Sequence, residues 1–174
     1  MEKKIYFSRE EMFTLNKERL LERGVKIEDI ALIAYNQQSK YTSGIRMEDC
    51  IESVCKILSY RDIFHLVQLS IEIDRLTESF RSPIQDIMKA DLGMFGIDEI
   101  FGLSIAQMYG TIGQTNFGDI DVNKPGIVRK LNEDGKEGSS HCHTFLDDVV
   151  GALAAAASTR VAQIMSEEVA KKRG

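Results

Sequence analysis

Apolar positions recur three and four residues apart over most of the chain, which is the spacing of an amphipathic helix. The alternation of apolar and polar residues that is typical of a half-buried strand is missing. The clearest helical series are Ile27, Ile30, Ala31 and Ala34, then Met47, Ile51, Val54, Cys55 and Leu58, then Ile63, Leu66, Val67 and Ile71. The pattern therefore predicts an all-α fold with no significant sheet.

Residues typical of helix ends divide the chain into separate helices. The signals for helix starts are Ser8 with Glu11, Ser59 with Asp62, Ser82 with Pro83, and Thr144 with Asp147. Gly24 is placed to end the first helix. We expect the last helix to run to the basic residues 171–173, because cations suit the negative end of a helix dipole.

Glycine separates the chain into two portions. Residues 1–92 contain two glycines, whereas residues 93–126 contain seven of the 13 in the chain. A length of 174 residues is typical of one domain. We therefore expect a single compact multi-helix domain, an irregular helical bundle, over residues 1–174, with a helical scaffold in 1–92 and the functional motifs in 93–174.

The composition of the chain indicates which partners and which cellular compartment to expect. The chain has three cysteines and no apolar leader at its N-terminus, so we expect a reduced, cytoplasmic protein. A net charge of −5 argues against a nucleic-acid partner. Residues 100–118 are uncharged, but their polar residues and glycines favour a buried helix and loop over a membrane span. Peripheral contact with a membrane stays open.

Three groups of acidic residues differ from those on solvated helix faces. Asp98–Glu99 and Asp147–Asp148 each open an apolar helix, and Asp119 and Asp121 come just before Lys124. Small residues follow each pair at four-residue intervals, namely Gly102, Ala106 and Gly110, and Gly151, Ala155 and Thr159. If these two stripes face each other, the helices approach closely and the carboxylates converge.

Converging carboxylates repel one another unless a cation lies between them. Mg²⁺ prefers carboxylate oxygens together with water and substrate phosphates, and Lys124 adds a positive charge for a phosphate. The pattern thus indicates metal-assisted phosphoryl chemistry. The alternative is structural, because the helix dipole favours acids in a first turn and Asp147 suits a capping box with Thr144.

Three short motifs in this region resemble those of the phosphatidylglycerophosphatase A family, and in particular its soluble YutG-like branch. The family patterns D-E-x-x-G, D-x-x-K-P and L-D-D correspond to residues 98–102, 121–125 and 146–148. The resemblance covers roughly the C-terminal half of the chain. It implies an all-helical, Mg²⁺-dependent hydrolase that converts phosphatidylglycerophosphate to phosphatidylglycerol, or that acts on a soluble phosphomonoester. The partner is then a phosphorylated small molecule or a lipid headgroup.

The resemblance also implies roles for individual residues. The candidate metal ligands are Asp98, Glu99, Asp121, Asp147 and Asp148. The candidate catalytic residues are Asp98, Glu99, Asp121, Lys124 and Asp148, with Lys124 as the phosphate contact.

The chain departs from the family at its N-terminal motif, A-P-G-T-x-G-S. The nearest segment, Tyr41 to Gly44, does not match it, and the membrane spans of the enzyme branch are also missing. A second hypothesis is therefore a non-catalytic helical binding or assembly protein that keeps the family scaffold. A third is a helical oligomer whose acids only cap helices. The small residues 151–157 suit packing within the chain or against a second subunit, and we expect a homodimer.

His141-Cys142-His143 lies four residues before Asp147. Histidine and cysteine bind Zn²⁺ and other transition metals, so His141 and His143 are candidate additional metal ligands. One of them is alternatively a general acid, and a plain polar loop is the structural alternative. Walker, dinucleotide-binding, nucleophile-elbow and zinc-protease motifs are missing, which argues against those enzyme classes.

Overall fold

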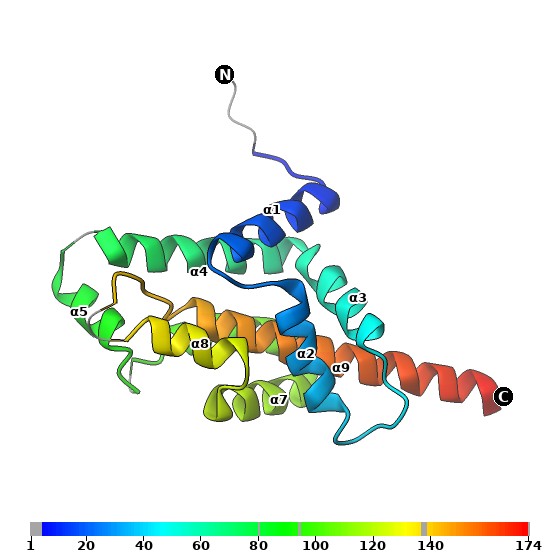
Figure 1. The fold of residues 1–174 in the computed structure, drawn as a ribbon. Coiled ribbons are helices and arrows are strands. Elements are labelled where there is room, and N and C mark those ends of the chain that lie inside the picture. The colour runs from blue at the N-terminus through cyan, green and yellow to red at the C-terminus, as the bar shows by residue number, and fades with distance from the viewer. Residues whose placement is uncertain (1–4, 80, 94, 137–138, 174) are drawn as a thin grey trace.

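The computed structural model describes residues 5–79, 81–93, 95–136 and 139–173, and these contain helices and no strand (Figure 1). The helices are α1 (Arg9–Glu22), α2 (Ile27–Gln38), α3 (Met47–Leu58), α4 (Arg61–Ser79), α5 (Pro83–Ala90), α6 (Asp98–Ala106), the 3₁₀ turn η1 (Gln107–Tyr109), α7 (Gly110–Asn123), α8 (Ile127–Asp134) and α9 (Leu146–Arg173). The all-α prediction is confirmed.

Helix α9 runs through the middle of the molecule, with α4 on one side and α7 and α8 on the other (Figure 1). All its residues from Leu146 to Thr159 are buried, which explains why this stretch is apolar or small on every face. The small residues 151–157 therefore pack inside the chain and not against a second subunit. Helix α9 is long and apolar enough to cross a membrane, but most of its apolar stretch is buried, as in the core helix of a soluble protein.

All four predicted helix starts are confirmed, and at two of them the predicted N-cap residue is in place. The Ser8 hydroxyl accepts the N–H of Glu11, and the Glu11 carboxylate accepts the N–H of Ser8, so both halves of the capping box are present. Ser82 is the N-cap of α5 with Pro83 in its first turn. Helix α1 also ends as expected, because Gly24 follows it in the left-handed region with a φ of +78°.

At the other two starts, α4 at Arg61 and α9 at Leu146, the predicted capping residue does not cap the helix. Ser59 ends α3, because its hydroxyl donates back to the carbonyl of Lys56. Thr144 donates its hydroxyl to the carbonyl of Met88, so it does not cap α9. A residue far away in the sequence caps α9 instead: the carboxylate of Asp74, on α4, accepts the N–H groups of Phe145 and Leu146.

The uncharged residues 100–118 are not a buried helix and loop. They form α6, η1 and α7, and Ile100 is 56% exposed and Ile112 63% exposed. We expected the small-residue stripes of α6 and α9 to face each other, and this also needs correction. The ring of Phe117, from α7, lies against both Gly102 of α6 and Gly151 of α9. The close approach of α6 and α9 to α7 therefore depends on one aromatic ring that two glycines accommodate.

Candidate functional site

The start of α6, the start of α9 and the end of α7 meet at one group of carboxylates. Asp98 and Glu99 come from α6, and Asp147 and Asp148 come from α9. Asp121 lies in the last turn of α7, with Lys124 just beyond it. The structure thus brings together the residues of all three motifs that the sequence singled out.

Lys124 occupies the centre of these acids. Its Nζ atom lies 2.7 Å from Asp121 Oδ1, 3.2 Å from Asp147 Oδ2 and 3.5 Å from Asp148 Oδ1. The turn that places it is strained, since Lys124 has a φ of +43° and the following Pro125 cannot continue the helix. Because its ammonium faces three carboxylates, a contact between Lys124 and a phosphate would have to replace one of these ion pairs.

A second set of acids shares Asp148 with Lys124 and adds Asp98 and Glu99 from α6. Carboxylate oxygens of Asp98, Glu99 and Asp148 all lie within 4.8 Å of one another. Asp98 Oδ1 and Glu99 Oε2 are buried and have no hydrogen-bond partner among the described residues. Buried polar atoms normally have such a partner, so this geometry suits a divalent cation that accepts several carboxylate oxygens.

The pKa values of these acids are consistent with carboxylates that lie close together and are buried. Burial raises the pKa of Asp98, and the neighbouring Glu99 carboxyl raises it further. Burial and the Asp147 charge raise the pKa of Asp148, while burial raises the pKa of Asp147 against the opposing effect of Lys124. The adjacent carboxylates raise the pKa of Lys124, and this effect outweighs its own burial. A divalent cation would stabilise the charged form of the same acids.

Asp91 joins this group, although no motif singled it out. Burial and the charges of Glu99 and Asp121 raise its pKa, whereas the Lys124 charge lowers it. Asp91 ends α5 with a φ of +44°, and Asp91 and Lys124 are the two non-glycine residues with positive φ in the described ranges. Unusual backbone of this kind concentrates at functional sites. The sequence offers one signal for it, an aspartate directly after a short predicted helix.

Asp119, in contrast, lies outside the carboxylate group. Its Oδ2 atom is 3.5 Å from the amine of Lys40 on the α2–α3 connection, and its Oδ1 atom accepts the amide of Asn123. The sequence grouped Asp119 with Asp121, but two residues on a helix point in different directions. Five of the six acids that the sequence singled out therefore converge: Asp98, Glu99, Asp121, Asp147 and Asp148.

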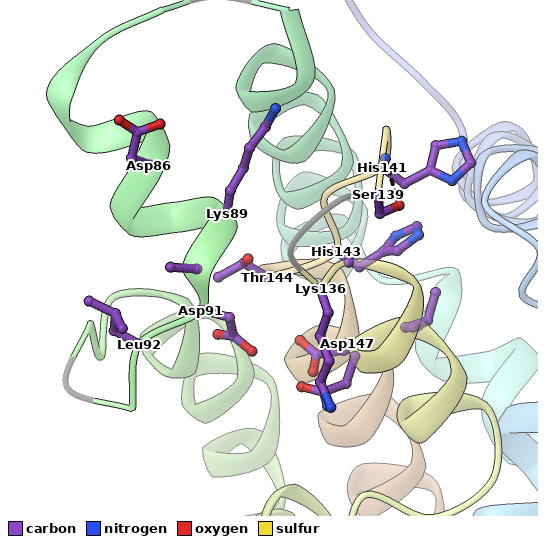
Figure 2. Close-up of a pocket in the computed structure, with 14 residues that line it drawn as sticks. Asp86, Lys89, Asp91, Leu92, Lys136, Ser139, His141, His143, Thr144 and Asp147 are labelled. Carbon is purple, nitrogen blue, oxygen red and sulfur yellow. Dashed lines mark hydrogen bonds between the residues drawn. The ribbon is translucent and has the colours of Figure 1, made fainter.

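A pocket of about 840 Å³ opens beside the carboxylates, with Asp147 and Asp91 in its wall (Figure 2). Its other walls come from α5, from the end of α8 and from the segment that precedes α9. Lys89, Lys136, His141 and His143 also line it. This volume is in the range of small-molecule sites.

The His-Cys-His segment divides between two environments. His141 Nδ1 and His143 Nε2 both lie 3.0 Å from Asp134 Oδ2. Cys142 points away from them, with its Sγ atom 3.7 Å from Asp74 Oδ1, and burial raises the pKa of its thiol to about 11. The cysteine is therefore not part of a ligand set with the two histidines.

The Asp134 carboxylate decides which nitrogen of His143 carries the proton. Because a carboxylate can only accept, Nε2 donates to Asp134 Oδ2 at 3.0 Å, and Nδ1, 3.2 Å from Arg23 Nη2, is the nitrogen without a proton in the neutral ring. A histidine that binds a metal through Nε2 instead needs its proton on Nδ1, directed at an acceptor. The contacts therefore favour the structural alternative, a hydrogen-bonded loop, over a transition-metal site.

Comparisons with known proteins show which family the chain belongs to. The family model of Phosphatidylglycerophosphatase A matches residues 32–163, so the similarity begins well before the C-terminal half in which the three motifs lie. The uncharacterized protein YpjQ of Bacillus subtilis (strain 168) is 44% identical over 160 residues, covering 90% of this chain and 87% of that protein. The uncharacterized protein YutG of the same organism is 40% identical over 146 residues, covering 83% of this chain and 86% of YutG.

Solved structures show the same fold. The crystal structure of ypjQ from Bacillus subtilis superposes with a TM-score of 0.85 at 42% identity, covering 92% of this chain and 99% of that one. The low temperature requirement C protein from Listeria monocytogenes gives a TM-score of 0.82 at 43% identity, covering 89% of this chain and 97% of that one. The chain therefore belongs to the phosphatidylglycerophosphatase A family.

Proposed function

We propose that the protein is a Mg²⁺-dependent hydrolase of phosphate monoesters. The observation that carries this proposal is that Asp98, Glu99 and Asp148 each place a carboxylate oxygen within 4.8 Å of the others. In addition, Asp98 Oδ1 and Glu99 Oε2 are buried and have no hydrogen-bond partner in the described part of the chain. Hard oxygen ligands in this number suit Mg²⁺, with water and substrate phosphate completing its coordination.

The residues of the chain have separable tasks in such a reaction. Asp98, Glu99 and Asp148 would hold the metal, and Lys124 fixes Asp147 and Asp148 at 3.2 and 3.5 Å. Bound Mg²⁺ supplies positive charge for the phosphoryl oxygens and lowers the pKa of a bound water. Asp147 lines the pocket, and the raised pKa of its carboxyl brings proton exchange closer to neutral pH, as a general acid or base requires.

Phosphate release from a panel of phosphomonoesters, measured as a function of Mg²⁺ concentration, tests the proposal. The panel contains phosphatidylglycerophosphate in detergent micelles and water-soluble phosphomonoesters. We expect Mg²⁺-dependent turnover, and a loss of kcat/KM of at least about 100-fold in Asp148→Asn. Asp119→Asn is the matched control, because Asp119 lies outside the carboxylate group. It should retain activity within about twofold.

Two kinds of result would count against the proposal, the first against the Mg²⁺ site and the second against hydrolysis. Turnover that does not need Mg²⁺, or that survives Asp148→Asn, would contradict the assigned site. Ligand-dependent thermal stabilisation in Mg²⁺ without turnover of any substrate would instead support the non-catalytic binding protein. In that protein the same carboxylates and metal would retain a ligand and not hydrolyse it.

A further inference from the structure

Helix α6 is apolar on its outer side as well as on its inner side. It packs against α4, α7 and α9. The residues that it buries there are Asp98, Gly102, Ile105 and Ala106. On the other side Ile100 is 56% exposed and Leu103 is 42% exposed. A helix with apolar residues on every side normally lies in the interior, as the first half of α9 does, so the outer side of α6 needs a cover that the described residues do not provide.

The outer side of α6 continues into that of α7. The two helices lie side by side and antiparallel, because Gly102 and Ala106 of α6 meet Phe117 and Gly113 of α7. Exposed residues three or four positions apart point away from α9 on both helices, and we call them the neutral face: Ile100, Leu103, Gln107, Thr111, Gln114 and Thr115. Residues 100–118 include no charged side chain, although 28% of the residues in the chain are charged.

Exposed apolar residues on α4 have different surroundings. Leu69 and Leu76 are exposed there, but the charged residues Glu72 and Arg75 lie between them. Both of these charged residues form ion pairs with α1. Single exposed leucines among charges are normal on a soluble protein. Apolar side chains without charged neighbours are instead typical of the core of an interface between subunits.

The charges around the neutral face decide which partner it suits. Between Lys89 and Lys124 the sequence contains no lysine, arginine or histidine, but it contains five acids. A helix that lies on an anionic lipid surface presents lysine and arginine to the headgroups, so this region does not suit such a surface. In a two-fold contact each side chain near the axis meets its own copy, so a charged side chain there would be repelled. A face without charges avoids this repulsion and suits a second copy of itself.

We propose that the neutral face binds the same face of a second copy of this chain, with Ile100 and Leu103 as the apolar anchors of a two-fold homodimer. Residues 151–157, the other stretch that suits a subunit contact by sequence, are buried within the chain and cannot take part. The dimer places the second copy on the outer side of the helix whose first turn supplies Asp98 and Glu99. Self-association through this face does not depend on hydrolysis at the carboxylate group.

Sedimentation equilibrium of the full chain, at loading concentrations from about 1 to 200 μM, measures the association. Leu103→Glu places a charge in the neutral face, and the double variant Ile100→Gln with Leu103→Gln removes both apolar anchors without adding a charge. Leu69→Glu is the matched control, because Leu69 is 51% exposed but lies on α4, outside the neutral face. Circular dichroism checks that each variant keeps its helices, and if Leu103→Glu does not fold, the double variant decides.

We expect the wild type and Leu69→Glu to sediment as dimers with a dissociation constant of about 10 μM or lower. Leu103→Glu and the double variant should raise this constant at least about 10-fold, because a few buried anchors supply most of the energy of an interface. A wild type that stays monomeric at the highest concentration would overturn the proposal. A dimer that is equally strong in Leu103→Glu and in the double variant would do the same.

Co-sedimentation with vesicles separates a second copy from a lipid surface as the occupant of the neutral face. The probes are vesicles of phosphatidylcholine alone and vesicles that also contain phosphatidylglycerol. We expect the wild type and Leu103→Glu to bind both kinds of vesicle equally weakly. Vesicle binding by the wild type that Leu103→Glu abolishes would assign the face to lipid and overturn the dimer.

Discussion

The carboxylate of Asp74, in the interior of α4, accepts the backbone N–H of Leu146, the first residue of α9, at 3.0 Å. Its other oxygen accepts the N–H of Phe145 at 3.1 Å. The N–H groups at the start of a helix have no partner within the helix, so a buried start needs acceptors from elsewhere. Because Asp147 and Asp148 come directly after Leu146, this contact also fixes the position of the two carboxylates that α9 contributes to the candidate metal site.

Replacing Asp74 should therefore destabilise the fold and weaken metal binding together. Asp74→Ala leaves two buried N–H groups without acceptors and should lower the free energy of unfolding by about 3 kcal/mol. Asp74→Asn keeps one acceptor oxygen, so its free energy of unfolding should lie between those of Asp74→Ala and the wild type. Urea unfolding measures the loss of stability, and Mg²⁺ titration of the folded variants measures the loss of metal binding. Asp62→Asn, an exposed acid on the same helix, is the control, and an Asp74→Ala protein as stable as this control would refute the capping role.

The strained turn at Asp91 offers a test that separates backbone strain from charge. Asp91→Gly relieves a φ of +44° and removes one acid from the group, so the metal-free protein should gain about 1 kcal/mol of stability. Asp91→Asn removes the charge but keeps the strain, so its gain should be smaller. Both should weaken Mg²⁺ binding if Asp91 contributes to the site. Unfolding in chelator and in excess Mg²⁺ measures both effects, and unchanged Mg²⁺ stabilisation in both variants would exclude Asp91 from the site.

The sequence predicted the helical architecture and the convergence of the three motifs, because both depend on local patterns. Helical periodicity and the capping box at Ser8 involve residues within one or two turns of each other. The acid pairs and the small residues that follow them indicated the starts of α6 and α9, although the two stripes pack on the Phe117 ring and not directly on each other. Each of these signals lies within a single segment.

The errors arose where a distant residue replaced a local one. Thr144 has the right type and spacing for an N-cap, but Asp74, some seventy positions away, supplies the acceptor, and the Thr144 hydroxyl bonds to Met88 instead. Distant residues also determine where Cys142 lies, since its thiol contacts Asp74 and Thr144 and not the two histidines beside it in the sequence. A periodic pattern contains no information on such partners, because it does not specify which helices pack together.

Gly102 should be intolerant of any side chain. A Cβ atom at this position would lie 2.4 Å from Phe117 Cζ, well inside van der Waals contact. Because Phe117 is buried, its ring cannot move into solvent, and Gly102→Ala should cost about 2 kcal/mol. Gly118→Ala is the matched control, since no atom lies within 4 Å of its Cβ and alanine is favoured in a helix, so it should stabilise the protein by about 0.5–1 kcal/mol.

A double variant shows whether the Phe117 ring is the cause. Gly102→Ala combined with Phe117→Leu should be more stable than the sum of the two single effects, with a coupling of about 1 kcal/mol. Additive losses would mean that the alanine clashes with something other than this ring. Thermal unfolding of the three proteins measures the coupling.

His143 should make the stability of the protein depend on pH below neutrality. Its burial and the adjacent Arg23 guanidinium lower its pKa in the folded state, against the opposing effect of Asp134. In the unfolded chain it titrates near a pKa of about 6.5. Between these two values the unfolded state binds the proton and the folded state does not, so the free energy of unfolding falls as the pH decreases below about 6.5.

His143→Gln isolates this contribution. Glutamine can still accept from Arg23 and donate to Asp134, but it does not titrate. Urea unfolding in chelator at several values between about pH 5 and pH 8 should show a smaller loss of stability towards acid in His143→Gln than in the wild type. Asp98 and Asp148, whose raised pKa values give the opposite dependence, are the same in both proteins, so their effect cancels in the comparison. Parallel curves for the two proteins would show that folded His143 accepts a proton as easily as unfolded His143 does, and that Arg23 does not hold it neutral.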